Sequence, residues 1–173
     1  MACRFPLLLP LCALALVACG SQEPGEDPAA TQQSRLGQPA RYDIDPATGA
    51  VSAEHTDAQG TTTRLAAGER LPVALPEPFT AFPDAEIVHN TRVEQGDGRL
   101  VYLDFATAAP VDAVTDFYRG QARKAGIVPH IDIEGQDSRT LGGENRALQL
   151  RFSLTARREG PLTKAQLVVG KAF

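Results

Sequence analysis

Cysteine is absent from the chain after position 19, because its three cysteines are Cys3, Cys12 and Cys19. The part that follows therefore has no disulfide, no thiol nucleophile and no thiolate metal ligand. It also lacks a run of clustered basic residues, and the formal net charge of the chain is −4. Such a composition has neither the electrostatic footprint of a nucleic-acid-binding protein nor the polybasic patch that attracts anionic lipid. Nucleic acid is therefore excluded as a class of partner.

Long apolar segments are lacking too, and the longest stands near the start of the chain. It runs from Leu7 to Ala18 after the positive charge of Arg4. It is about a dozen residues long, whereas a helix needs roughly 20 to span a bilayer. A basic residue, a short apolar core and small residues before a cleavage point are typical of an export signal. We therefore predict that residues 1–18 are a cleaved signal peptide and not a transmembrane anchor.

The end of this signal carries a short motif, Leu16-Val17-Ala18-Cys19. It resembles the bacterial lipobox, and the resemblance implies that Cys19 is acylated after cleavage. In place of the aspartate typical of inner-membrane retention stands Gly20, which favours the outer membrane, with the protein facing the periplasm. Two or three acyl chains anchor a protein stably. The sequence thus predicts a lipid-anchored envelope protein, and the alternative is an ordinary secretory signal with a chance cysteine.

The remainder divides by composition into four parts. Residues 19–40 are rich in Gly, Pro, Ser and Gln and predict a flexible tether about 25 Å from end to end. Residues 41–66 hold short alternating runs between turn sequences and predict a small β-meander. Residues 67–84 are rich in proline and predict an extended linker. Residues 85–173 remain as the main domain.

The main domain carries alternating apolar patterns on both sides of one helical pattern. The spacing predicts strands at 86–93 and 100–105, an amphipathic helix over 110–125, and strands at 127–133, 148–154 and 167–169. The element order is ββαβββ. We expect an α+β fold with an antiparallel-dominated sheet and one helix on its apolar face.

Two short motifs in this domain, Phe82-Pro83-Asp84-Ala85 and Phe117-Tyr118-Arg119, accompany the proline-rich lead-in and the strand pair. In these features the chain resembles, over about residues 70–170, a family of uncharacterised bacterial lipoproteins. The resemblance implies the fold and the envelope location. It implies no activity, so no functional residue is transferred.

The predicted helix leaves the opposite sheet face open. The alternation in the strands predicts that this face carries Tyr102, Asp104, His130, Asp132, Arg151 and Ser153. These are the candidate binding residues. Plain exposure to solvent is the alternative, because antiparallel sheets commonly leave one face wet.

Motifs for catalysis or metal binding are scarce. The three histidines, His55, His89 and His130, lack the spacing of zinc ligands. The acidic stretch from Asp132 to Asn145 lacks the spacing of an EF-hand and predicts a solvated, Gly-rich loop. We therefore expect no metal, no cofactor and no enzyme, and favour a non-catalytic module that binds or organises an envelope protein.

Two other functions stay open. A carrier or sensor of a small apolar or lipid ligand would use a cavity lined by Phe105, Phe117, Tyr118 and Phe152. A hydrolase of envelope material would need an acid–base pair assembled from separate strands, with Asp104, Asp132 and His130 as its candidates.

Overall fold

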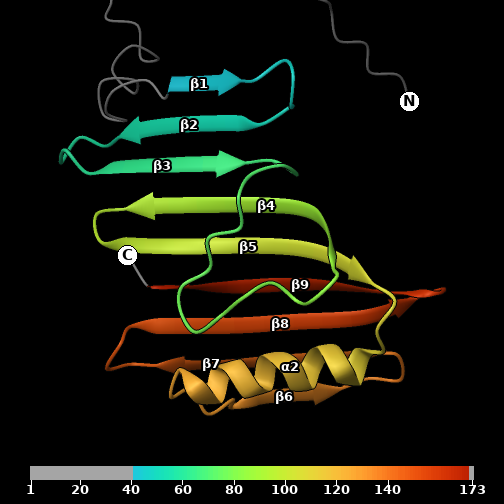
Figure 1. The fold of residues 1–173 in the computed structure, drawn as a ribbon. Coiled ribbons are helices and arrows are strands. Elements are labelled where there is room, and N and C mark those ends of the chain that lie inside the picture. Colours follow the sequence, from blue (N-terminus) through green and yellow to red (C-terminus); the bar gives the residue numbers. More distant parts are fainter. Residues whose placement is uncertain (1–40, 172–173) are drawn as a thin grey trace, which may run out of the picture.

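The computed structural model describes residues 41–171, which form one antiparallel sheet of nine strands with a helix on one side (Figure 1). The strand order across the sheet is β1-β2-β3-β4-β5-β9-β8-β7-β6. The predicted α+β class is confirmed. No helix within residues 41–171 is long and apolar enough to cross a membrane.

Four strands follow the helix, so the predicted order ββαβββ is one strand short. The elements are β1 (Arg41–Ile44), β2 (Val51–Thr56), β3 (Thr62–Ala67), β4 (Glu86–Gln95), β5 (Gly98–Thr107), α2 (Val111–Lys124), β6 (Ile131–Glu134), β7 (Ser138–Asn145), β8 (Leu150–Glu159) and β9 (Leu162–Lys171). The missed strand is β7, which occupies the stretch predicted as a Gly-rich loop. Its glycines are needed for packing, because a Cβ on Gly143 would lie 2.8 Å from Cγ2 of Ile127.

The helix α2 follows directly from its sequence. Its N-cap is Pro110, whose extended φ and ψ suit the position before the first turn. Buried Val114, Tyr118 and Ala122 recur at a spacing of four residues and form one apolar stripe. The helix is followed by Gly126 at a φ of 69°, a conformation that favours glycine. The prediction of a helix over 110–125 is confirmed.

The core lies between α2 and the central strands. Leu103, Leu154 and Leu167, from β5, β8 and β9, are all fully buried beneath the helix side of the sheet. Because paired residues of an antiparallel sheet share a face, the alternate residues of these strands point to the other side.

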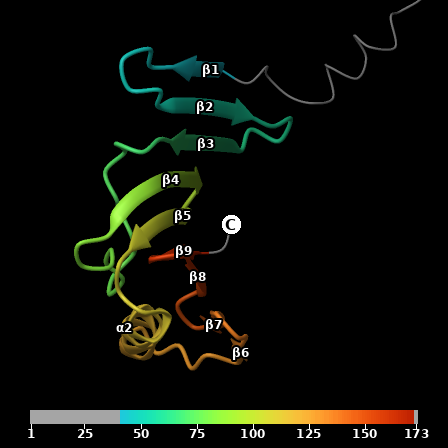
Figure 2. The same ribbon diagram turned by 90° about the vertical axis from the view of Figure 1, so that its right-hand side faces the viewer.

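The proline-rich segment, residues 68–85, also covers this side of the sheet. Phe79 is 3% exposed, and its ring lies 5.4 Å from the ring of Phe152. The side-chain amide of buried Asn90 donates to the carbonyls of Leu71 and Pro72 at 3.0 and 3.2 Å. In Figure 2 this segment and α2 lie on the same side of the sheet. The segment predicted as a linker is thus part of the core.

The residues of the predicted meander are the first three strands of the same sheet. β3 pairs with β4, and Leu65 stands opposite Val93. Neither α2 nor residues 68–85 extends over β1 and β2 in the two views (Figures 1 and 2). We call the side that carries α2 and residues 68–85 the covered face, and the other side the open face.

Candidate functional site

The open face carries four of the six candidate binding residues. Strand pairing aligns side chains in rows across the sheet, and one row contains Thr91, Tyr102, Val168, Ser153, Gly142 and Ile131. The neighbouring rows hold Asp104, which pairs with Gln166, and Arg151, which pairs with Gly170. Tyr102, Asp104, Arg151 and Ser153 therefore share one face, as the alternation of the strands indicates.

Asp132 and His130 lie elsewhere. Asp132 pairs with buried Leu141 and points to the covered face. The open side of β6 instead shows Ile131 and Ile133, which are 41% and 62% exposed. The predicted phase of this strand is inverted, because the alternation placed its isoleucines in the core. His130 stands just before β6, where it is exposed and its backbone N–H donates to the carbonyl of Gly142.

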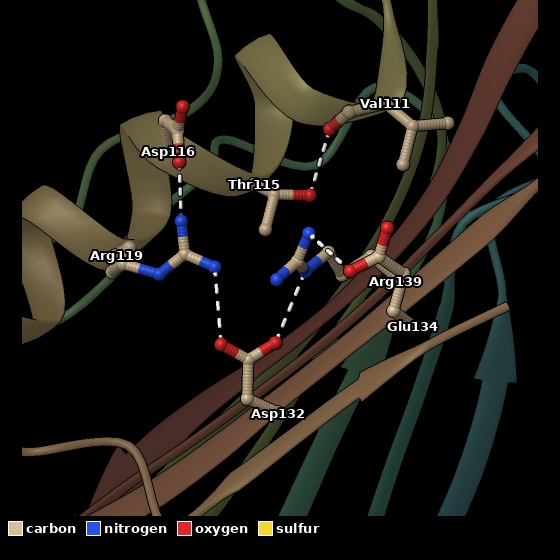
Figure 3. Close-up of polar contacts among 7 residues, drawn as sticks. All are labelled: Val111, Thr115, Asp116, Arg119, Asp132, Glu134 and Arg139. Carbon is tan, nitrogen blue, oxygen red and sulfur yellow. Dashed lines mark hydrogen bonds and ion pairs between the residues drawn. The ribbon is translucent and has the colours of Figure 1, made fainter.

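The carboxylate of Asp132 belongs to an ion-pair network between α2, β6 and β7 (Figure 3). Its two oxygens accept hydrogen bonds from Nη2 of Arg119 at 3.2 Å and from Nε of Arg139 at 3.0 Å. Arg119 also pairs with Asp116, and Arg139 lies 3.2 Å from Glu134. The hydrogen bond from Arg139 holds the pKa of Asp132 below its usual value. With both oxygens engaged, this carboxylate ties the edge strand β6 to the helix and is not placed to act as a base.

The open face of β1–β5 forms a second feature, which sequence reasoning did not identify. We call it the meander patch and define it as Tyr42, Ile44, Val51, Ala53, His55, Thr63, Leu65, Ala67, Thr91, Val93, Leu100 and Tyr102. It contains no Asp, Glu, Lys or Arg. Three members are widely open to solvent, with Tyr42 at 64%, Ile44 at 51% and Tyr102 at 38% exposure.

The opposite side of the same strands is charged. It bears Arg41, Asp43, Glu54, Arg64, Arg92, Glu94 and Arg99. Nε of Arg64 lies 2.7 Å from Glu54, and Nε of Arg99 lies 2.9 Å from Glu94. In β1–β3 most of the apolar side chains are therefore on the open face and the charged ones on the other side. In the central strands most of the apolar side chains are on the covered face instead. The alternating pattern of residues 41–66 was visible in the sequence, but the pairing of β3 with β4 decides which side it faces.

The polar half of the open face lies over β9 and β8. There a hollow of about 400 Å³ is lined in part by Asp104, Thr155, Arg157, Lys164 and Gln166. The amide of Gln166 donates to the carboxylate of Asp104 at 3.1 Å. The charged groups, amides and hydroxyls around this open hollow provide both hydrogen-bond donors and hydrogen-bond acceptors.

The aromatic residues proposed to line a ligand cavity are packed against one another. The ring of Tyr118 lies 6.0 Å from that of Phe105 and 5.1 Å from that of Phe117. Phe152 stacks on Phe79. Burial raises the pKa of Tyr118 well above its usual value, so its phenol stays protonated. These rings fill the space between the helix and the sheet, so the aromatic residues at these positions are explained by core packing.

No family model, no curated protein and no solved structure matches the chain in comparisons with known proteins. Within residues 41–171, no group of three or more His, Cys, Asp or Glu side chains is placed to hold a metal ion. The lipidation residue predicted from the sequence, Cys19, lies outside the described residues.

Proposed function

We propose that this chain is a lipid-anchored envelope lipoprotein whose folded part is a binding or scaffolding module. Its anchor is the acylated Cys19, and its place is the periplasmic side of the outer membrane. The lipobox-like motif before Cys19 supports the anchor. The resemblance to envelope lipoproteins over residues 70–170 supports the location.

The observation that carries the binding role is the polar half of the open face. Asp104, Arg151 and Ser153 stand together there, beside the hollow of about 400 Å³, and Tyr102 of the meander patch borders them. Within the described residues no helix or loop lies over this half. Hydrogen-bond donors and acceptors around an open hollow are typical of a protein-binding surface that stays partly hydrated. An envelope protein is therefore the partner we propose.

The three residues proposed for a hydrolase, Asp104, Asp132 and His130, do not lie together at one site. Asp104 and Asp132 point to opposite faces of the sheet, on strands β5 and β6. Four strand spacings separate these strands, a distance of about 19 Å. His130 lies beside the distal strand β6 and not between the two carboxylates. These residues do not converge on one bond of a substrate.

A photocrosslinking experiment in intact cells tests the binding role. A photoreactive residue at Ser153 reports on the polar half of the open face, and one at Arg123, exposed near the end of α2, is the matched control. We expect capture of one dominant envelope protein from position 153 and not from 123. Capture of the same species from both positions, or of none from either, contradicts the proposal.

The anchor is tested separately by Cys19→Ala. The variant should move from the membrane fraction to the soluble fraction after export, because the two or three acyl chains proposed at Cys19 are lost. Full retention in the membrane fraction would show that Cys19 is not the anchor.

A further inference from the structure

We infer that the meander patch rests on the surface of the lipid bilayer to which the chain is anchored. This inference relies on the proposed acylation of Cys19. It assigns the two halves of the open face different contacts: the meander patch meets lipid, and the polar half stays available to a protein partner.

The first step is the separation of charge in β1–β3. Every Asp, Glu, Lys and Arg of these strands stands on one side, and the other side bears Tyr, Ile, Val, Leu, Ala, Thr and His. A strand that alternates in this way has one side in water and one against an apolar phase. The elements that form the core, α2 and residues 68–85, lie on the charged side and give the patch no cover.

The second step is the place where the chain enters the sheet. β1 is the edge strand, and it is the first strand after the residues that lead back to Cys19. It also carries two exposed apolar side chains, Tyr42 and Ile44. Farther from this edge, on β9 and β8, the open face becomes charged, with Lys164 and Arg157. Both edges of the face expose apolar side chains, because Ile131 and Ile133 stand on β6, but the edge at β1 is the one nearest the proposed anchor.

The third step is the effective concentration of the bilayer. Residues 19–40 lie outside the described residues, and the tether predicted for them from the sequence would reach about 25 Å. A link of this length keeps the meander patch close to the lipid surface, so that its effective concentration at that surface is about millimolar. A contact too weak to recruit a free protein is then sufficient to orient an anchored one.

The composition of the patch fits shallow contact. Tyr42 and Tyr102 carry a ring with a polar tip, which suits the zone between headgroups and acyl chains. Because the patch has no Lys or Arg, the contact should depend little on anionic lipid or on salt. Within the described residues no strand pairs with the outer edge of β1, so the N–H and C=O groups of this edge need water, which prevents deeper insertion.

A single tryptophan reports on this contact, since the chain has none. We would place Tyr42→Trp in the full lipidated protein and reconstitute it in phosphatidylcholine vesicles with brominated acyl chains. Ser52→Trp is the matched control, because Ser52 is exposed on the charged side of neighbouring β2. We expect blue-shifted emission and at least about twofold stronger quenching at position 42 than at position 52.

A second variant guards against a local artefact. Adding Ile44→Asp to Tyr42→Trp should return the emission to that of a water-exposed indole, while the circular dichroism spectrum stays unchanged. The inference is overturned if vesicles float with the protein but the tryptophan at position 42 is quenched no more than the control. It is also overturned if the blue shift disappears on dilution of the protein in the vesicles, since a second copy would then cover the patch. Failure of the protein to float at all instead refutes the proposed anchor.

Discussion

Strands β5, β8 and β9 direct Leu103, Leu154 and Leu167 toward α2, whereas β1–β3 direct Ile44, Val51 and Leu65 to the other side of the same sheet. Each strand is hydrogen-bonded to the next from one region to the other, with one register irregularity between Ile87 and His89 of β4. Pairing therefore extends a sheet regardless of which side is apolar. In each region, the side chains determine which side of the sheet is apolar and which side is charged.

The largest expected effect comes from matched leucine truncations in the two regions. Leu154→Ala removes a fully buried side chain from the core and should lower the free energy of unfolding by about 2–5 kcal/mol. Leu65→Ala, on the half-exposed meander patch, should cost less than about 1 kcal/mol, because solvent already reaches the side chain. Urea denaturation of both variants measures the difference. Equal losses would mean that the patch is packed as tightly as the core.

A smaller effect is expected where residues 68–85 are fastened to the covered face. Asn90→Ala removes the amide that donates to the carbonyls of Leu71 and Pro72, and should cost about 1–3 kcal/mol in unfolding free energy. The segment should also become more sensitive to limited proteolysis. Thr91→Ala, one residue along and on the open face, is the control and should leave the segment protected. Unchanged proteolysis of the Asn90 variant would show that these two hydrogen bonds do not hold residues 68–85 against the sheet.

Two exposed isoleucines at opposite edges of the sheet sharpen the comparison further. Ile44→Ser and Ile133→Ser alter side chains that are 51% and 62% exposed, and each should change stability by less than about 0.5 kcal/mol. Only Ile44→Ser should weaken the contact of the meander patch with vesicles, measured by the tryptophan quenching described above on the Tyr42→Trp background. Equal weakening by Ile133→Ser would show that the contact is not specific to the first strands.

Sequence patterns predicted the elements whose environment is uniform. α2, β5 and β8 each keep one apolar phase against the core, so their periodicity was sufficient. β7 was missed because Gly142 and Gly143 weaken its strand signal, although the tight approach of Ile131 and Ile127 requires small residues there. In β6 the phase was inverted because Asp132 reaches Arg119 and Arg139 on the covered face.

The two regions also differ in which elements their ion pairs on the covered face connect. Glu54 and Arg64 join β2 to β3 only, whereas Asp132 joins β6 to α2 through Arg119 and to β7 through Arg139. Because the folded-state pKa of Asp132 is lowered, its stabilising contribution is present above its usual pKa and is lost as pH falls through the lowered value.

The smallest expected effect is on this titration. Arg139→Leu should raise the pKa of Asp132 toward its usual value, but not fully, because Arg119 remains 3.2 Å away. The acid-dependent part of the folding stability should shrink in parallel. Titration of the Asp132 carboxyl carbon by NMR measures the shift, and Arg146→Leu, which instead removes the partner of Glu144, is the control. A pKa of Asp132 that responds equally to both substitutions would indicate a general charge effect, and the link between β6 and α2 would then rest on packing alone.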